Sequence, residues 1–255
     1  MTVSPARTPL SPILTETPIV AVLRARHARE YAPVIEALVA GGVRSIELTL
    51  STDGVFEHLP ELIKNFGERA EIGVGTITSR DQAKRALDGG AAYLVTPITD
   101  LNIIAAATAR RVPVFPGGLT PTELFSAWDA GATAVKLFPA STVGPGYIAQ
   151  LRGPFPGIRV VPSGGIGVDD AAAWIRAGAS AVSLGGPLLG DAFAGGDLAA
   201  LTDRARRLVD NVADARGEAR PAVSAGAEHA SENVSTAEPA AARVAENPSS
   251  VEVAR

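Results

Sequence analysis

A phrase that recurs along the chain constrains the fold most strongly. A helical stretch ends in Ala-Gly or Gly-Gly and a short apolar strand follows, as in ALVAGGVRSIEL, ALDGGAAYLV, AWDAGATAVKL and WIRAGASAVSL. Strands that alternate with longer amphipathic segments are typical of a parallel sheet with crossover helices. The recurrence favours a closed (β/α)8 barrel (TIM barrel) over an open sheet, and in such barrels the chemistry lies where the strands end.

This barrel is expected to occupy residues 18–215, after an N-terminal extension of residues 1–17. The predicted strands are Ile19–Leu23, Ser45–Leu50, Glu71–Val74, Tyr93–Val95, Val112–Phe115, Ala134–Phe138, Arg159–Val161 and Ala181–Leu184. Helix candidates include Ala28–Ala40, Ser79–Leu87, Leu101–Arg110, Pro121–Asp129, Asp169–Ala177 and Leu198–Val212. Polar residues near N-caps, such as Ser79 and Thr120, and glycines just after helices support these boundaries.

The last part of the chain departs from the pattern. Residues 216–255 contain no aromatic residue and no apolar periodicity. Such a segment has too little apolar surface to offset the entropy of ordering it. We expect a disordered C-terminal tail.

Composition excludes several classes of protein. The 255 residues are 46% hydrophobic and 20% charged, and no run of about 18 apolar residues predicts a membrane span. Residues 1–17 lack the apolar stretch of a secretory signal, so we expect a cytoplasmic protein. A net charge of −4 gives no basic footprint for nucleic acid. The absence of Cys excludes disulfides and thiolate chemistry.

Metal and hydrolase chemistry are also disfavoured. The three histidines are His27, His58 and His229, and none follows a predicted strand with ligand spacing. No G-x-S-x-G motif precedes a plausible partner histidine. We expect neither a metal nor a cofactor.

Lys136 is the strongest single chemical signal. Lysine occurs only three times among 23 Lys and Arg residues, so this chain normally uses Arg where a cation is solvated. Lys136 lies in the apolar strand ATAVKLFPA, near its C-terminal end. An apolar setting favours the neutral amine, which attacks a ketone to form a Schiff base. The alternative is a lysine that extends from the barrel rim to water.

Glu47 lies in the middle of the predicted strand RSIELTL. If it faces inward, burial raises its pKa and makes it a candidate proton shuttle. The alternative is a structural ion pair with Arg24 or Arg44.

Two further side chains follow predicted strands. Thr76 ends the strand EIGVGTI, where Gly73 and Gly75 are expected to let a ligand or neighbouring backbone approach, and its hydroxyl suits a carboxylate. A helix N-cap is the alternative for Thr76. Arg24 ends VAVLRAR and suits a carboxylate or phosphate, with Arg26 as the competing candidate.

Glycine pairs follow the last two predicted strands, in VVPSGGI and VSLGGPLL. Their N–H groups predict a phosphate site, to which Ser163 can add a hydroxyl. Tight turns are the alternative reading of these glycines.

The motifs GVRSIELTL, GVGTI, TPITD, FPGG, KLFPA and PSGGI, in this order, resemble the KDPG/KHG aldolase family over residues 18–212. The resemblance implies a class I aldehyde-lyase acting on a small keto acid, a (β/α)8 barrel and a homotrimer. It assigns Lys136 to the Schiff base, Glu47 to acid-base catalysis and Thr76 to the pyruvate carboxylate. Further residues implied are Pro97, Pro116 and Phe138 around the keto acid, and Ser163, Gly164, Gly165, Gly185 and Gly186 around the phosphate.

Two departures bear on the substrate. Many family members carry an Arg four residues after the glutamate, where this chain has Ser51. In the branch resembling 2-keto-3-deoxy-6-phosphogalactonate aldolase, an Arg at the end of the first strand takes this part, and Arg24 matches it. Pro187 stands where a Ser often follows the last glycine pair, and proline has no N–H to donate.

The expected reaction is cleavage of a 2-keto-3-deoxy-6-phospho sugar acid to pyruvate and glyceraldehyde 3-phosphate, or of 4-hydroxy-2-oxoglutarate to pyruvate and glyoxylate. The rival functions are a phosphate-binding barrel isomerase or epimerase, which does not need Lys136, and a non-catalytic trimeric scaffold of the same fold.

Overall fold

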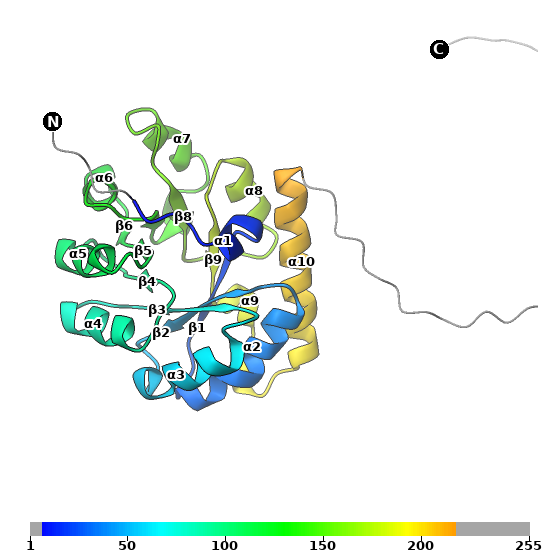
Figure 1. Cartoon of the computed structure of the whole chain (residues 1–255). Coiled ribbons are helices and arrows are strands. Elements are labelled where there is room, and N and C mark those ends of the chain that lie inside the picture. The colour runs from blue at the N-terminus through cyan, green and yellow to red at the C-terminus, as the bar shows by residue number, and fades with distance from the viewer. Residues whose placement is uncertain (1–6, 218–255) are drawn as a thin grey trace, which may run out of the picture. The chain divides into compact units, whose positions relative to one another are not determined.

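Short parallel strands form a ring at the centre of the structure, a computed structural model that describes residues 7–217 (Figure 1). The strands are β1 (Ile19–Leu23), β2 (Ser45–Thr49), β3 (Glu71–Gly75), β4 (Leu94–Val95), β5 (Val114–Phe115), β6 (Gly117–Gly118), β7 (Val135–Leu137), β8 (Val160–Pro162) and β9 (Val182–Leu184). Hydrogen bonds join them into a six-stranded sheet of order β5-β4-β3-β2-β1-β9 and a three-stranded sheet of order β6-β7-β8.

Two links close these sheets into one barrel. Strands β5 and β6 belong to a single extended run that is interrupted at Pro116, which has no N–H for the ladder. This run pairs with β4 on one side and with β7 on the other. At the second junction a parallel bridge joins Ser163, after β8, to Ser183 in β9. With β5 and β6 counted as one strand, the predicted (β/α)8 barrel is confirmed.

Helices surround the ring (Figure 1). They are α1 (Pro12–Glu16), α2 (Tyr31–Ala40), α3 (Val55–Phe66), α4 (Arg80–Asp88), α5 (Leu101–Ala109), α6 (Pro121–Asp129), α7 (Tyr147–Arg152), α8 (Ala171–Arg176), α9 (Gly186–Leu189) and α10 (Leu198–Arg216), with 3-10 turns η1 (Ala28–Glu30), η2 (Ala140–Thr142) and η3 (Ala192–Ala194). The side chains of Ser79 and Thr120 accept hydrogen bonds from the N–H groups of Gln82 and Glu123, so both predicted N-caps are present.

Successive side chains of a strand belong to two separate apolar cores. On β1, Ile19, Ala21 and Leu23 belong to the larger core, which fills the space between strands and helices. Val20 belongs to the smaller core, whose other members come from facing strands inside the barrel. Because adjacent strand residues point to opposite faces, every second residue of a strand is directed into the barrel.

Helix α1 lies in the segment for which the sequence predicted no helix. The Ser11 side chain caps it by accepting a hydrogen bond from the Leu14 N–H. Leu14 is 1% exposed and packs with Val20, Tyr93 and other members of the inner core. Residues before β1 therefore contribute to the barrel interior at its N-terminal end.

The C-terminal helix α10 continues to Arg216 rather than ending at Val212. The predicted tail lies outside the described residues from 218 onward. Within residues 7–217, no helix has both the length and the apolar character needed to cross a bilayer.

Leu14→Ala should destabilise the barrel, because removing a buried leucine side chain loses its transfer free energy and leaves a cavity in the inner core. We expect a loss of about 3 kcal/mol in the free energy of unfolding, measured by urea denaturation. Ile13→Ala, on the partly exposed side of α1, is the matched control and should cost less. Equal losses for the two variants would contradict the packing role of Leu14.

Candidate active site

Glu47 lies inside the barrel because it occupies an inward position of β2. Its neighbours Ile46 and Leu48 pack in the outer core, so the carboxylate is directed to the opposite face. Only 1% of Glu47 is exposed. Gly75 on the adjacent strand β3 leaves space for the carboxylate, because a Cβ at this position would overlap Glu47 Oε1. A residue other than glycine at position 75 is incompatible with this placement.

Both glycines of β3 make room for side chains of neighbouring strands. A Cβ on Gly73 would overlap the ring of Tyr93, in the same way that one on Gly75 would overlap Glu47. The sequence interpretation, in which these glycines let a ligand or backbone approach, is therefore corrected. The pleat directs Gly73 and Gly75 into the interior, where the Tyr93 ring and the Glu47 carboxylate already fill the space.

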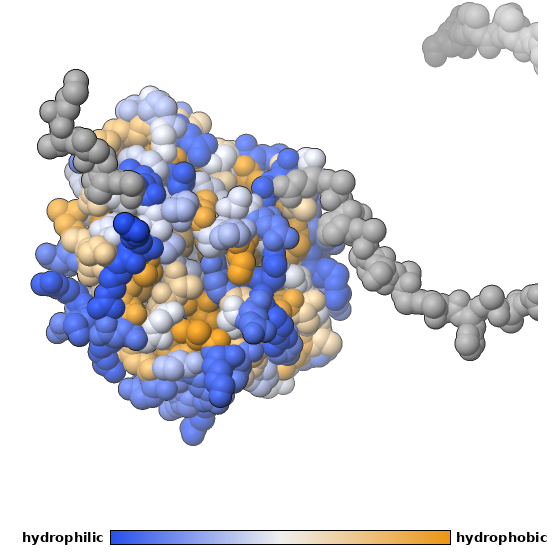
Figure 2. Space-filling model, viewed as in Figure 1, coloured by the Kyte–Doolittle hydropathy of each residue, from blue (hydrophilic) through white to orange (hydrophobic). Residues whose placement is uncertain are grey.

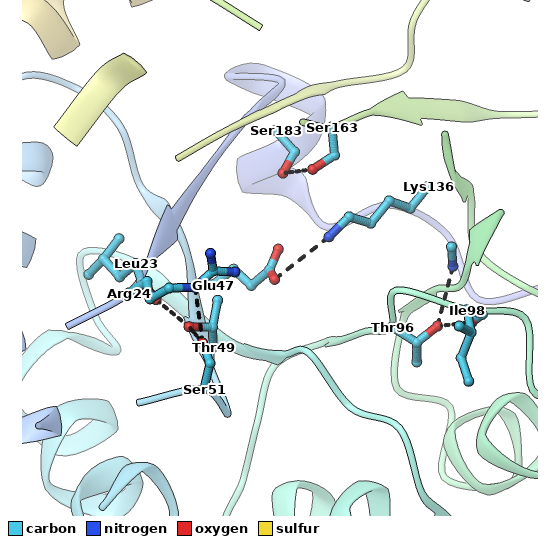
Figure 3. A network of polar contacts seen from close by, with 11 residues as sticks. Leu23, Arg24, Glu47, Thr49, Ser51, Thr96, Ile98, Lys136, Ser163 and Ser183 are labelled. Carbon is cyan, nitrogen blue, oxygen red and sulfur yellow. Dashed lines mark hydrogen bonds and ion pairs between the residues drawn. The ribbon is translucent and has the colours of Figure 1, made fainter. Parts of the chain in front are cut away.

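Lys136 faces Glu47 from the opposite wall of the barrel. It lies in β7 and is 8% exposed, so it is not a lysine that extends from the rim to water. Its Nζ lies 3.9 Å from Glu47 Oε1, and Figure 3 shows the two side chains pointing toward one another. The alternative pairing of Glu47 with Arg44 is excluded, because Arg44 is paired with Glu16 at 2.6 Å.

The Glu47 carboxylate has an unusual electrostatic setting. Neither of its oxygens has a hydrogen-bond partner. Burial raises the pKa of Glu47, and the charges of Lys136 and Arg24 oppose this effect. A carboxylate held without hydrogen bonds next to an amine is suited to take up and release a proton.

Arg24 follows β1 and is held by the end of β2. Its Nε donates to Ser51 Oγ at 3.0 Å, and Ser51 Oγ lies 3.0 Å from Thr49 Oγ1. Thr49 Oγ1 in turn donates to the carbonyl of Leu23 at 2.9 Å. Figure 3 shows Arg24 and Lys136 on either side of Glu47. The hydrogen bond to Ser51 fixes the Nε of Arg24. It does not use the two terminal nitrogens of the guanidinium, which can donate to a ligand.

Thr76 directly follows β3 in a left-handed conformation, with φ of 61°. This conformation is rare for a β-branched residue, and such strain clusters at functional sites. Thr76 is not a helix N-cap, because Ser79 takes that position. Its side chain lines the same cavity as Glu47 and Lys136.

These side chains meet in one cavity of about 620 Å³ at the C-terminal ends of the strands. We call it the active-site cavity. Of the residues predicted for the site, it is lined by Arg24, Glu47, Thr76, Pro97, Lys136, Phe138, Ser163, Gly164, Gly165, Gly185 and Gly186. Pro116 does not line it. The Pro116 carbonyl instead accepts a hydrogen bond from the Lys136 backbone N–H at 2.7 Å, so Pro116 supports the strand that carries the lysine.

The two glycine loops differ in what their glycines do. Gly164 and Gly165 have φ of 91° and 73°, so their turns favour glycine for conformational reasons. At Gly186 a Cβ would meet nothing within 4 Å, which leaves open space beside the loop after β9. Ser163, predicted to face a phosphate, donates to Ser183 Oγ at 3.3 Å.

Sequence reasoning missed part of the cavity wall. Val22, Leu189, Gly190, Phe193 and Ala194 also line it. Phe193 and Ala194 come from η3, a short turn without apolar periodicity, so the sequence carried no signal for their position. Arg26, the competing candidate to Arg24, lines the cavity as well.

The arrangement of titratable side chains outside the cavity also bears on metal binding. In the described part of the chain, no group of three or more His, Asp or Glu residues is arranged to hold a metal ion. His27 instead lies 5.3 Å from His58, ring centroid to ring centroid, and caps η1.

The closed (β/α)8 barrel, with a buried lysine and glutamate in a cavity at its strand ends, is a barrel with an enzyme-like site. Comparisons with known proteins define the family. The family model described as KDPG and KHG aldolase matches residues 10–203. The chain belongs to this family, whose enzymes are aldolases and therefore carbon–carbon lyases.

Individual relatives agree with this membership. The 2-dehydro-3-deoxy-6-phosphogalactonate aldolase of Escherichia coli K12 is 33% identical, over 68% of this chain and 85% of the relative. The 2-dehydro-3-deoxy-phosphogluconate aldolase of Dickeya dadantii is 35% identical, over 80% of this chain and 96% of the relative. A solved structure described as native KDPGal is similar with a TM-score of 0.73 and 31% identity, covering 78% of this chain and 96% of its own.

Gly75→Ala should displace the Glu47 carboxylate while leaving the barrel folded. Since the added methyl overlaps Glu47 Oε1, we expect aldolase turnover to fall at least 100-fold, measured by coupled pyruvate release. The control is Gly146→Ala, where a Cβ meets nothing within 4 Å and φ is −59°. Unchanged turnover in Gly75→Ala would show that the position of Glu47 does not matter for catalysis.

Proposed function

We propose that this chain is a class I aldolase that cleaves a 2-keto-3-deoxy-6-phospho sugar acid to pyruvate and glyceraldehyde 3-phosphate. The observation that carries the proposal is the buried pair of Lys136 and Glu47, whose charged atoms lie 3.9 Å apart in a cavity at the strand ends. An amine nucleophile next to a carboxylate proton shuttle is what Schiff-base cleavage of a carbon–carbon bond needs.

Lys136 performs the covalent part of the reaction. Its neutral Nζ attacks C2 of the keto acid, and loss of water gives a protonated imine. When the C3–C4 bond breaks, its electron pair moves into the imine and forms an enamine. Protonation at C3 and addition of water then release pyruvate and restore the amine.

Glu47 moves the protons of this cycle. It accepts the proton of the C4 hydroxyl as the aldehyde leaves, and it shuttles protons during formation and hydrolysis of the imine. Its raised pKa supports this role, because a carboxylate that is harder to ionise is a stronger base when it is ionised.

The remaining lining residues bind the two ends of the substrate. We assign Arg24 and the Thr76 hydroxyl to the pyruvate carboxylate, with Pro97 and Phe138 shaping the wall around it. We assign the phosphate to the loops that contain Gly164, Gly165, Gly185 and Gly186, where the open space beside Gly186 admits a ligand. The Ser163 hydroxyl can donate to this phosphate when it no longer donates to Ser183 Oγ.

We base our proposal for the substrate on Arg24. Relatives named for phosphogalactonate and phosphogluconate are similarly close to this chain, at 33% and 35% identity. Arg24 is held by Ser51, which stands where many family members have an arginine. This arrangement favours the galactonate-type acid, with 4-hydroxy-2-oxoglutarate as a shorter substrate.

We also propose a homotrimer, in keeping with the family resemblance. The large apolar side chains exposed in the described residues are Ile98, Leu101, Phe125, Phe138 and Val143. All five come from the part of the barrel between β4 and α7, and contact between subunits there would remove their apolar surface from water. Analytical ultracentrifugation measures the oligomeric state.

Borohydride reduction in the presence of pyruvate should add one reduced pyruvate to Lys136. Intact mass and peptide mapping identify the modified residue. Lys136→Ala should form no adduct and lose turnover by at least 1,000-fold, while its circular dichroism stays that of the parent. No adduct in the parent protein would move the assignment to an isomerase of the same fold, and retained turnover in Lys136→Ala would overturn the proposed mechanism.

Glu47→Gln is the companion variant, because it keeps the amine but removes the proton acceptor. It should still form the reduced adduct while turning over slowly. In the parent, kcat/KM should be lost as pH falls through the raised pKa of Glu47, since the protonated carboxyl accepts no proton. Glu47→Gln should lack this acidic limb.

Ser51→Ala should loosen Arg24 and weaken binding of the substrate carboxylate. We expect KM for 2-keto-3-deoxy-6-phosphogalactonate to rise about five-fold with kcat little changed, because one hydrogen bond to a charged group is lost. Ser51→Thr, which keeps the hydroxyl, should restore KM. If Ser51 acts through Arg24, the effects of Ser51→Ala and Arg24→Ala will not add; additive effects would show that Ser51 acts independently.

A further inference from the structure

A second cavity lies at the opposite end of the barrel from the active-site cavity. It is also about 620 Å³, and we call it the N-terminal cavity. Its lining residues come from the segment around α1, the start of β8, and the ends of α8 and α10. Figure 1 shows α1 beside α8 and the C-terminal end of α10, and Figure 2 shows hydrophilic residues over those helix ends.

The charge of this cavity has one sign. Three of its lining residues are arginines, namely Arg159, Arg176 and Arg216, and none is an Asp or Glu. Within residues 7–217, no ion pair or hydrogen bond engages the guanidinium of Arg159 or Arg176. Arg216 donates to the carbonyls of Thr15 and Glu16, which fixes its side chain across the cavity mouth at α1.

Helix dipoles account for only part of this arrangement. Arg176 and Arg216 lie in the last turns of α8 and α10, where a cation is stabilised by the helix C-terminus. Arg159 precedes strand β8, so no helix C-terminus stabilises its charge. It lies close enough to Arg7 to lower the pKa of that guanidinium by charge repulsion, after the larger effect of burial. Asp129 acts on Arg7 in the opposite direction, and it is not among the residues that line the cavity.

The remaining lining places apolar and hydroxyl groups beside the arginines. Leu10, Leu14 and Ile175 give the cavity an apolar wall, and the Ser180 hydroxyl adds a donor beside the arginines. One guanidinium group can donate two parallel hydrogen bonds to two oxygens of a phosphate. Arginine is therefore a common phosphate-binding residue.

We propose that the N-terminal cavity is a binding site for a small phosphorylated anion, separate from the active-site cavity. Arg159, Arg176 and Ser180 contact the phosphate, and Arg216 closes the site from α10. The proposal does not depend on the reaction assigned to Lys136, because none of its residues lines the active-site cavity.

The test uses the full chain and inorganic pyrophosphate as the probe. In a titration followed by backbone amide NMR, signals of Ala179 and Ser180 should shift with a saturable dependence on pyrophosphate. Shifts at Gly164 and Gly186 report the active-site loops separately. In Arg159→Gln/Arg176→Gln, the dissociation constant from the Ala179 and Ser180 signals should rise at least ten-fold, with pyruvate release unchanged.

The control is Arg29→Gln/Arg80→Gln, which removes the same charge from exposed positions outside the cavity and should bind as the parent does. The proposal is overturned if the Ala179 and Ser180 signals do not shift, or if the cavity variant binds as tightly as the parent. It is also overturned if the cavity variant shifts the signals of residues 218–255 without pyrophosphate, because the chain's own carboxylates would then be the anion.

Discussion

The structure depends on placing a carboxylate and an amine inside an apolar barrel. Glu47 is 1% exposed and has no hydrogen-bond partner for either oxygen, so its ionised form is stabilised mainly by the charges of Lys136 and Arg24. A buried charge without such neighbours costs several kcal/mol or becomes neutral. The barrel accommodates the carboxylate only because Gly75 leaves its volume empty on the adjacent strand.

Much of the fold was predictable because each unit repeats the same local chemistry. The helix, glycine and apolar strand sequence recurs before four of the strands, and all eight predicted strands begin within two residues of the observed ones, which is the usual uncertainty of element ends. The break at Pro116 was not predicted, since it depends on the ladder that a proline cannot complete. Helix α1 was also missed, because five residues with one buried leucine show no periodicity.

The candidate site was predictable where residue type conflicted with its surroundings. Lys136 and Glu47 are charged residues within apolar strands, and both lie in the interior. The function of Gly75 was not predictable, because whether a glycine makes room for a ligand or for a side chain depends on the pairing of β2 with β3. The hydrogen bond from Arg24 to Ser51 likewise joins residues 27 positions apart and follows from strand adjacency.

The two ends of the barrel are closed to different extents. At the C-terminal end the strands stop short, and loop residues with unusual backbone conformations, such as Thr76 and Gly164, leave a cavity open to substrate. At the N-terminal end the inner core requires a cover, which Leu14 of α1 provides. A helix of five residues covers only part of that end, so the space between α1, α8 and α10 remains as a second cavity. Because three arginines line that remainder together with apolar side chains, its surface carries a charge that packing alone does not require.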